Sequence, residues 1–327
     1  MLTHEIEERF EQLQQWLAAH LAMPVQRVSR LAGDASSRQY YRVYCRDRCY
    51  IAMDALSDRD SCTAFIAIAN AFRGLGLNVP IIYAQDIQQG FLLMTDFGDR
   101  LYCDVLTVDT CHELYQQAFR DLLMIQSCSD VKGYALPFFT HTHYFNEMAL
   151  FHDWYLSQYL RITLSKTQYH QLQQLYTLLA EMALSQPLVC VHRDYHSRNL
   201  MVVDSTSSPG ILDFQGAVWG PITYDIVSLV RDCYIHWPPS QVEGWIRQFH
   251  QQALQADLLE EEDPQLFLQW TDWMGLQRHM KCIGLFARLQ LRDNKSAYLQ
   301  YIPRVIQYAR EVCERYSPLT EFTSFFR

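Results

Sequence analysis

One segment constrains what this chain can fold into more than any other. Residues 188 to 215 read LVCVHRDYHSRNLMVVDSTSSPGILDFQ. An apolar run is followed by the polar tripeptide HRD, which ends at Asp194, and Asn199 comes five residues later. Two apolar stretches, LMVV and GILDF, then flank a turn rich in serine, and the second contains Asp213. This order predicts a strand, a polar loop and two strands that together hold three oxygen-bearing side chains in place.

These side chains suit phosphoryl transfer from ATP. That reaction needs a group that orients or deprotonates the acceptor hydroxyl, and ligands for magnesium between the phosphates. Asp194 fits the first role. Asn199 and Asp213 fit the second, because Mg²⁺ takes oxygen ligands in near-octahedral geometry. The structural alternative is a turn-capping Asp and Asn beside a buried His192.

The tripeptide D-F-G also occurs elsewhere, as Asp96-Phe97-Gly98 in FLLMTDFGDR. In protein kinases D-F-G supplies a magnesium ligand, but it follows the catalytic loop. Here it comes long before the HRD segment, so we assign the metal-binding tripeptide to Asp213-Phe214-Gln215. Asp96 is predicted to be a turn or capping residue. Met94, just before it, lies where a kinase hinge would meet adenine.

The spacing of apolar residues changes near residue 96 and predicts an α+β chain of two lobes. Strands are expected at 27–32, 39–46, 49–56, 81–86 and 91–95, with a helix at 61–73 between them. Helices are expected at 110–127, 143–160, 167–184, 221–236, 240–256, 264–292 and 296–315. We therefore expect a β-rich, nucleotide-binding lobe over residues 1–96. A larger helical lobe over 97–327 would carry the catalytic and substrate-binding residues.

Composition limits the class of protein. The chain is 49% hydrophobic and 19% charged, which is typical of a soluble globular enzyme, and its net charge of −9 argues against a nucleic-acid partner. Apolar runs are too short for a membrane span, and the opening MLTHEIEERFEQLQQWLAAH is acidic and amphipathic, unlike a signal peptide. Ten cysteines without a C-x-x-C indicate reduced thiols. We expect a cytoplasmic protein with no membrane contact and no obligate protein partner.

Taken together, these motifs resemble the aminoglycoside phosphotransferase-like superfamily of small-molecule kinases, which share the two-lobed protein-kinase-like fold. GDASSRQYYRV looks like its phosphate-covering loop and following strand, and HRDYHSRNL looks like its catalytic loop. The pattern LDFQ-A-V-GP-TYD-SL-RD-Y-WP is most similar to the anomeric amino-sugar kinases of bacterial cell-wall recycling. Those enzymes use ATP to phosphorylate C1 of N-acetylmuramate and N-acetylglucosamine. The resemblance therefore implies ATP and Mg²⁺ as cofactors and a small sugar as substrate.

The resemblance also implies roles for individual residues. It places six residues at the nucleotide: Gly33, Ser36, Ser37, Arg38, Arg42 and Met94. Asp225 would brace the catalytic loop by accepting hydrogen bonds from its backbone, although an ordinary carboxylate at a helix N-terminus is equally favoured there. His192, His196 and Arg198 would support the loop. The last two either contact phosphate or sugar or only shape the loop.

One departure from kinases is informative. A kinase strand V-A-I-K supplies a lysine to the ATP phosphates, whereas the matching CYIAMDAL has Met53 and Asp54, and the first lysine of the chain is Lys132. Arginine can bind phosphate with two parallel hydrogen bonds. We expect Arg38 to replace the missing lysine, with Arg42 as the second candidate. The alternative is an exposed strand face that carries charge.

Other functions remain open on sequence alone. A kinase of the same fold could act on an aminoglycoside, which needs a carboxylate-lined cleft, or on choline, which needs an aromatic cage. The missing lysine also permits a non-catalytic nucleotide-binding protein, although an intact Asp194, Asn199 and Asp213 argues against it. If the acceptor is N-acetylmuramate, four residues are candidates to meet its lactyl carboxylate: Arg231, Arg278, His279 and Arg288.

Overall fold

The computed structural model describes residues 2–31, 38–56, 58–204, 206 and 208–326. The chain divides into two compact units. Unit 1 comprises Met1–Arg100, Asp130–Ala135 and Met201–Gln215. Unit 2 comprises Leu101–Ser129, Leu136–Leu200 and Gly216–Arg327. The division predicted from sequence gave each lobe one continuous segment, whereas unit 1 also takes in two segments that return to it later in the chain.

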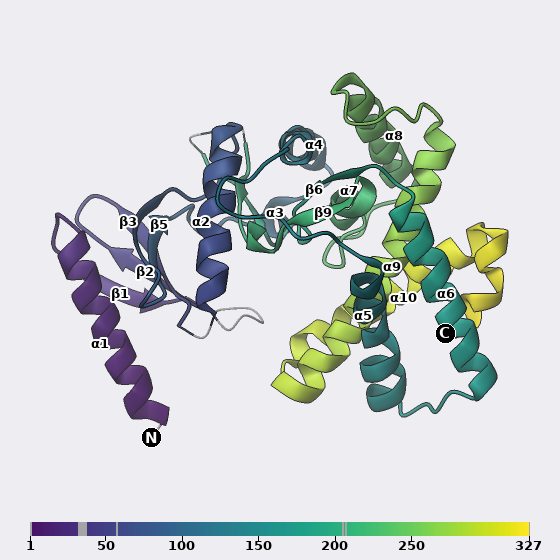
Figure 1. Cartoon of the computed structure of the whole chain (residues 1–327), viewed down its shortest axis with the longest axis horizontal. Coiled ribbons are helices and arrows are strands. Elements are labelled where there is room, and N and C mark those ends of the chain that lie inside the picture. The colour runs from purple at the N-terminus through teal and green to yellow at the C-terminus, as the bar shows by residue number, and fades with distance from the viewer. Residues whose placement is uncertain (1, 32–37, 57, 205, 207, 327) are drawn as a thin grey trace. The chain divides into compact units, whose positions relative to one another are not determined.

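Unit 1 is built on a five-stranded antiparallel sheet with the order β1-β2-β3-β5-β4. Its strands are β1 (Arg27–Arg30), β2 (Gln39–Tyr44), β3 (Cys49–Asp54), β4 (Ile82–Asp86) and β5 (Phe91–Thr95). Two helices, α1 (Leu2–His20) and α2 (Arg59–Gly74), flank this sheet (Figure 1). Each predicted strand and the predicted α2 helix are therefore present, with ends shifted by one or two residues.

Alternation along the strands decides what each face of the sheet contacts. Leu13 and Leu17 of α1 pack with Tyr41 and Val43 of β2 in one buried cluster. Side chains alternate between faces with period two, so Tyr40 and its neighbours at even positions of β2 point to the opposite face. That face is where the sequence predicts contacts with the nucleotide.

Unit 2 is largely helical. Its longer helices are α4 (Cys111–Gln126), α5 (His141–Leu150), α6 (Lys166–Leu184), α7 (Thr223–Val230), α8 (Pro239–Gln255), α9 (Pro264–Asp293) and α10 (Ile302–Arg315). The unit also contains the short helix α3 (Tyr102–Val105), a π-helix (Phe151–Tyr159) and the 3₁₀ segments Phe214–Gly216, Ser296–Tyr301 and Ser317–Phe325. The 30-residue α9 contacts α5, α6, α7, α8 and α10 and forms the centre of this unit (Figure 1).

Close packing explains why one predicted helix is divided. The helix expected over 143–160 is α5 up to Leu150 and a π-helix from Phe151. Helix α9 packs against this junction through Gly284. A Cβ atom on Gly284 would lie 2.1 Å from the carbonyl carbon of Leu150. Only glycine allows two helix backbones to approach this closely.

The short strands differ from the prediction in two places. β6 (Leu188–Val191) is present as expected, but it pairs with β9 (Val218–Pro221), a strand that the sequence pattern did not indicate. The strand predicted for GILDF covers only β8 (Gly210–Ile211), which pairs with β7 (Leu200–Met201). Asp213 has φ of 62°, which is incompatible with a strand, so the chain turns before the tripeptide Asp213-Phe214-Gln215 is complete.

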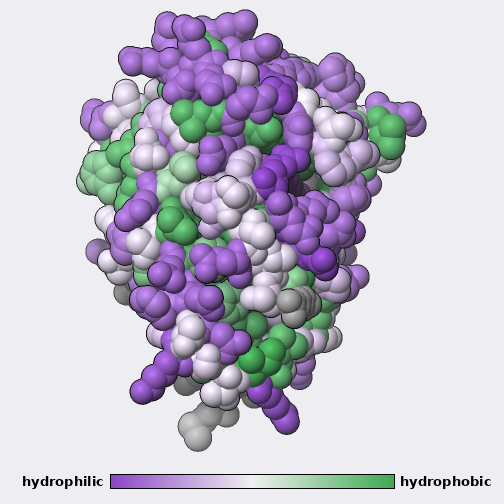
Figure 2. All heavy atoms as spheres, turned by 90° about the vertical axis from the view of Figure 1, so that its right-hand side faces the viewer, coloured by the Kyte–Doolittle hydropathy of each residue, from purple (hydrophilic) through white to green (hydrophobic). Residues whose placement is uncertain are grey.

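Two general expectations can be compared with the structure. Within the described ranges, none of the helices combines the length and apolar character that crossing a membrane requires. All ten cysteines are free thiols, as predicted. The face drawn in Figure 2 is mainly hydrophilic, and its hydrophobic side chains form small separate groups.

Candidate active site

The catalytic loop follows β6 in unit 2, and the buried carboxylate of Asp225 holds its beginning. Asp225 accepts hydrogen bonds from the backbone N–H groups of His192, at 2.6 Å, and Arg193, at 3.0 Å. Arg193 adopts a left-handed conformation with φ of 78°, and such strain persists only where surrounding contacts enforce it. Burial raises the pKa of Asp225 to about 7, although these two backbone donors favour its ionised form. The bracing hydrogen bonds expected for Asp225 are therefore present.

Asp232, just after α7, holds the second half of the loop. Its carboxylate accepts from the backbone N–H of Ser197 at 2.9 Å and from that of Tyr234 at 3.0 Å. Within the loop, the side-chain amide of Asn199 donates to the carbonyl of Asp194 at 2.9 Å. The Asn199 amide nitrogen is thus engaged, and the amide oxygen is the atom with which this residue could bind a metal.

Two other loop residues, His192 and Arg198, contact neighbouring groups of unit 2. His192 is fully buried, and its Nδ1 accepts from the backbone N–H of Asp194 at 3.3 Å. The guanidinium of Arg198 lies 3.9 Å from the ring centroid of Tyr234 and donates to the hydroxyl of Tyr301 at 2.9 Å. These contacts fix the orientation of both side chains within the loop.

Asp194 is surrounded by positive charge. Burial raises the pKa of its carboxyl, but the nearby cations outweigh burial and hold that pKa well below its ordinary value. The groups that favour the ionised form, largest first, are Lys281, His196, Arg278 and Arg193. Asp194 is therefore an anion at neutral pH, which is the form in which a carboxyl group can take a proton from an acceptor hydroxyl.

A buried carboxylate on α5 orders two of these cations. Glu147 Oε1 lies 2.8 Å from Lys281 Nζ and 2.8 Å from Arg193 Nη2. Tyr224 and Gln277 donate to its other oxygen at 3.3 Å and 3.1 Å. Burial raises the pKa of Glu147, but the two cations outweigh it and lower the pKa to about 2. Glu147 and Lys281 are not predicted from the sequence, because nothing in their local patterns separates them from ordinary charges on helix surfaces.

The four candidates for a lactyl carboxylate have different surroundings. Arg278 donates to the carbonyl of Arg193 at 2.8 Å, so it holds the strained loop residue. Arg231 forms an ion pair with Asp272. Burial, with Arg231 and Arg278 nearby, lowers the pKa of His279 to about 3, so His279 is neutral at physiological pH. Arg288 is not among the described residues that line the pocket beside Asp194.

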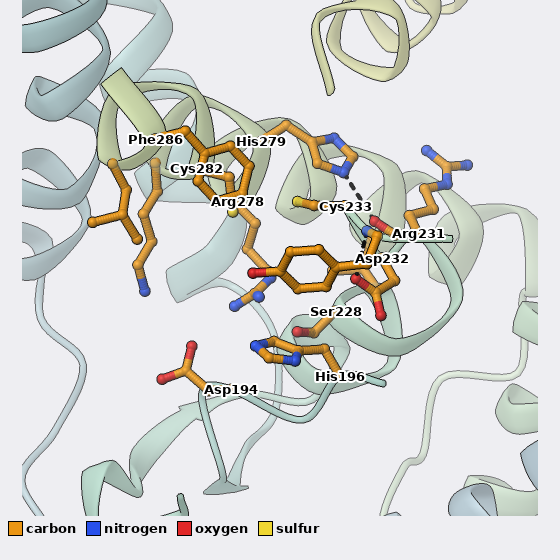
Figure 3. A pocket seen from close by; sticks show the side chains of 14 residues that line it. Asp194, His196, Ser228, Arg231, Asp232, Cys233, Arg278, His279, Cys282 and Phe286 are labelled. Atoms are coloured by element: carbon orange, nitrogen blue, oxygen red, sulfur yellow. Dashed lines mark hydrogen bonds between the residues drawn. The ribbon is translucent and has the colours of Figure 1, made fainter. Parts of the chain in front are cut away.

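That pocket opens within unit 2 between the catalytic loop, α7 with the residues after it, and α9 (Figure 3). Asp194 lies at one side, and Ser228 of α7 and Arg278 of α9 also line it. Tyr234 and Phe286 add aromatic surface. A concave site with aromatic surface and a few convergent polar groups suits a small polar molecule.

In unit 1, Arg38 faces the residue that the sequence predicts to bind the metal. Arg38 Nη1 lies 3.9 Å from Asp213 Oδ1 and 3.5 Å from the hydroxyl of Tyr40, and Nε lies 3.6 Å from Asp58. Asp213 Oδ1 also accepts from the side chain of Gln215 at 2.7 Å. The side chain of Asp213 is 46% exposed, so its carboxylate remains accessible to a ligand.

Arg42, the second candidate for the phosphates, forms ion pairs with the turn that follows β5. Its guanidinium binds both carboxylate oxygens of Asp99, at 2.7 and 2.9 Å, and lies 2.6 Å from Asp96 Oδ2. It also donates to the carbonyl of Gly98 at 2.9 Å. Asp96 accepts from the backbone N–H of Gly98 at 2.9 Å, which makes it the turn residue that the sequence predicts. Because the guanidinium of Arg42 binds three residues of this turn, Arg38 is the better candidate to bind the phosphates.

The other predicted nucleotide contacts are placed only in part. Met94 lies in the paired region of β5, between β3 and β4, with its side chain buried. At the position of the missing lysine, Met53 is fully buried, and Asp54 is held by Arg9 at 2.8 Å. Gly33, Ser36 and Ser37 lie outside the described residues.

Comparisons with known proteins support the resemblance. The chain is 37% identical over 331 residues to the N-acetylmuramate/N-acetylglucosamine kinase of Pseudomonas putida, which covers 98% of this chain and 96% of that protein. It is also 37% identical to the protein of the same name from Pseudomonas aeruginosa, over 96% of this chain and 94% of that protein. The protein of that name from Neisseria meningitidis is 35% identical, over 88% of this chain and 86% of that protein.

Solved structures confirm the predicted protein-kinase-like fold. The ADP-bound aminoglycoside phosphotransferase APH(2'')-Ib matches with a TM-score of 0.62 and 13% identity, over 93% of this chain and 98% of that chain. Spectinomycin phosphotransferase APH(9)-Ia matches with a TM-score of 0.62 and 14% identity, over 92% of this chain and 98% of that chain. In sequence, the phosphotransferase enzyme family matches residues 27–262. The chain therefore belongs to the phosphotransferase enzyme family.

Proposed function

We propose that this phosphotransferase is an ATP-dependent kinase that phosphorylates the anomeric C1 hydroxyl of N-acetylmuramate and N-acetylglucosamine during peptidoglycan recycling. The observation that carries the proposal is near-full-length identity of 37% to two kinases named for both sugars. The pocket of unit 2 supports it, because an ionised carboxylate, neutral polar groups and aromatic surface line one small concavity.

In this proposal Asp194 orients the C1 hydroxyl and accepts its proton as the oxygen attacks the γ-phosphorus of ATP. The new bond joins the C1 oxygen to phosphorus, and the bond from phosphorus to the β,γ-bridging oxygen breaks, which releases ADP. Lys281, Arg278 and Arg193 keep Asp194 anionic and add positive charge beside the reaction. Arg193 and Arg278 also hold the loop in position.

The residues present fit a magnesium ion. Asp213 offers an accessible carboxylate. Asn199 offers its amide oxygen, because its amide nitrogen already donates a hydrogen bond to the carbonyl of Asp194. Such hard oxygen donors, completed by phosphate oxygens, are the usual ligands of Mg²⁺. When bound, the ion would neutralise the phosphates of ATP. The two residues belong to different units, and we propose their joint role from the order of the sequence motif.

For the nucleotide, we propose that Arg38 takes the place of the missing lysine, because its guanidinium faces Asp213. Gly33, Ser36 and Ser37 would cover the phosphates, and the backbone near Met94 would meet adenine. Residues 1–96 would then form the nucleotide-binding lobe, and residues 97–327 the catalytic and sugar-binding lobe. ATP use and ten free thiols support a cytoplasmic location.

Phosphorus NMR of the product tests the proposal directly. Wild-type protein with ATP and magnesium should convert each sugar to a product whose phosphorus couples to the anomeric proton, and Asp194→Asn should form little product. Phosphorylation of an aminoglycoside or choline, with neither amino sugar converted, would instead identify a kinase of another alcohol. ATP binding without turnover of any acceptor would identify a non-catalytic protein.

A further inference from the structure

One face of α7 is directed at the catalytic loop. Asp225 and Ser228 are three residues apart, and Asp232 follows four residues after Ser228. Residues at this spacing share one side of a helix and of the turn that continues it. Asp225 holds the start of the loop through His192 and Arg193, and Asp232 holds its second half through Ser197. Ser228 lies between these two contacts.

Ser228 differs from Asp225 and Asp232 because its side-chain hydroxyl has no hydrogen-bond partner among the described residues. Its Oγ is buried, with the residue 4% exposed, and makes no hydrogen bond to any residue that the structure describes. A serine inside a helix commonly donates to the carbonyl four residues back. Here no such bond to Tyr224 is made, although leaving a buried hydroxyl unpaired is unfavourable.

The position of this hydroxyl indicates what could pair it. Ser228 lines the same pocket as Asp194 and His196 (Figure 3). Across the described part of the chain, Nδ1 of His196 likewise lacks a hydrogen-bond partner. Nδ1 of His279, which also lines the pocket, has no partner among the described residues either, so three residues in the walls around the anionic Asp194 carry an unpaired polar atom. A bound molecule with several hydroxyl or amide groups would satisfy them.

The charged side chains of the pocket indicate which kind of ligand group would lie beside Ser228. The lysine and the two arginines that line this pocket already have partners: Lys281 pairs with Glu147, Arg231 pairs with Asp272, and Arg278 donates to the carbonyl of Arg193. Ser228 itself is neutral. These surroundings favour recognition of a neutral hydroxyl or acetamido group over recognition of a carboxylate.

We propose that Ser228 is an acceptor-binding residue that hydrogen-bonds a hydroxyl or acetamido group shared by N-acetylmuramate and N-acetylglucosamine. By fixing the orientation of the sugar in the pocket, this bond would present the C1 hydroxyl to Asp194. The inference rests on the proposed function for the identity of the acceptor. A hydrogen bond from Ser228 to a group that both sugars carry would explain how the two sugars share one site.

Ser228→Ala tests this inference. Losing one neutral hydrogen bond should lower kcat/KM for each sugar about two- to tenfold, and by the same factor for both. The KM for ATP should stay unchanged. The melting temperature should stay the same or rise, because the wild-type hydroxyl has no partner to lose. With a deoxy sugar that lacks the contacted group, wild type and Ser228→Ala should have equal kcat/KM.

Thr271→Val is the matched control. Thr271 is also a fully buried hydroxyl inside a helix, but it donates to the carbonyl of Phe267 at 2.8 Å. Its loss should lower the melting temperature and leave kcat/KM for the sugars unchanged.

Several results would overturn the inference. If Ser228→Ala behaves like Thr271→Val, the serine is structural. Equal losses for ATP and sugar would mean that Ser228 acts through the loop. A loss confined to N-acetylmuramate would mean that it contacts the lactyl side. If wild-type protein phosphorylates neither sugar, the proposed function fails, and the same comparison on the alcohol that it does phosphorylate still decides whether Ser228 binds the acceptor.

Discussion

The guanidinium of Arg38 lies 3.9 Å from the carboxylate of Asp213 within unit 1. Nη1 of Arg38 also lies 3.5 Å from the hydroxyl of Tyr40. Tyr40 on β2 is the residue directly opposite Met53 on β3. Met53 occupies the place where a kinase strand carries its lysine. Arg38, which directly precedes β2, and the position of the missing lysine on β3 therefore lie at the same region of the sheet, next to the proposed metal ligand.

If Arg38 replaces the lysine, Arg38→Ala should weaken ATP binding by about one to two decades, since charge-assisted hydrogen bonds contribute roughly 1.5–3 kcal/mol. Adenosine binding should barely change, because adenosine has no phosphate. Calorimetric titration with both ligands measures the difference. Arg38→Lys should recover only part of the affinity, because an ammonium lacks the planar fork of arginine.

The sharper control restores the usual residue. Met53→Lys in the Arg38→Ala background should recover some ATP affinity if the two positions reach the same phosphates. Equal losses for ATP and adenosine in Arg38→Ala would instead show that Arg38 only holds the surrounding loop.

Asp194→Asn should reduce kcat on the order of a hundredfold or more, because it removes the anion that accepts the proton of the acceptor. ATP affinity should stay near that of wild type. Steady-state kinetics with each sugar, together with ATP titration, checks both statements. Turnover within a few-fold of wild type would remove Asp194 from this role.

Metal dependence should separate the two D-F segments. Asn199→Ala and Asp213→Ala should each raise the magnesium concentration that gives half-maximal activity, and Asp213→Ala should do so more because it removes a charge. Asp96→Ala should leave this concentration nearly unchanged but lower thermal stability, because the Asp96 side chain is only 8% exposed and lies 2.6 Å from Nε of Arg42. A lost magnesium response in Asp96→Ala would contradict the assignment of the metal site.

Glu147 should make stability depend on pH. Its folded pKa of about 2 lies below the ordinary 4.5, so the unfolded chain binds its proton first as the pH falls. The stabilisation is thus fully present above about pH 5 and is lost toward pH 2, and it amounts to about 3 kcal/mol at neutral pH. Urea unfolding should show Glu147→Gln less stable than wild type at pH 7, with a difference that shrinks below pH 5.

A surface carboxylate provides the control for this experiment. Glu314 pairs with Arg310 at 2.7 Å on an exposed face of α10. Glu314→Gln should change the free energy of unfolding by less than about 1 kcal/mol at any pH, as is usual for exposed pairs. Equal effects of the two substitutions would contradict the role given to Glu147.

Gly284→Ala should be among the more damaging single substitutions in unit 2. The added methyl group would lie 2.1 Å from the backbone of Leu150, and backbone atoms cannot move aside easily. Overpacking of this kind lowers the free energy of unfolding by about 1–3 kcal/mol or more. Gly244→Ala in α8 is the control, because no atom lies within 4 Å of the added group, and it should stabilise the helix slightly. Thermal unfolding of both variants measures the contrast.

The sequence by itself was sufficient for the strands of unit 1, the main helices and the catalytic loop. Period-two alternation, helical spacing and the fixed distance from Asp194 to Asn199 are local properties, and local sequence encodes them. Order along the chain also distinguishes Asp96 from Asp213, because Asp96 follows a strand that precedes the HRD segment and Asp213 follows that segment.

Only the tertiary structure decided which charges belong together. Glu147 and Lys281 form an ion pair between two helices that are far apart in sequence. Arg42 forms an ion pair with Asp99, whereas strand alternation alone would allow Arg42 to bind phosphate. The unpaired hydroxyl of Ser228 is likewise invisible in a helical pattern. Sequence periodicity reports which face a residue occupies. Its partner on that face depends on how distant elements pack, and burial then decides whether the pairing affects stability or chemistry.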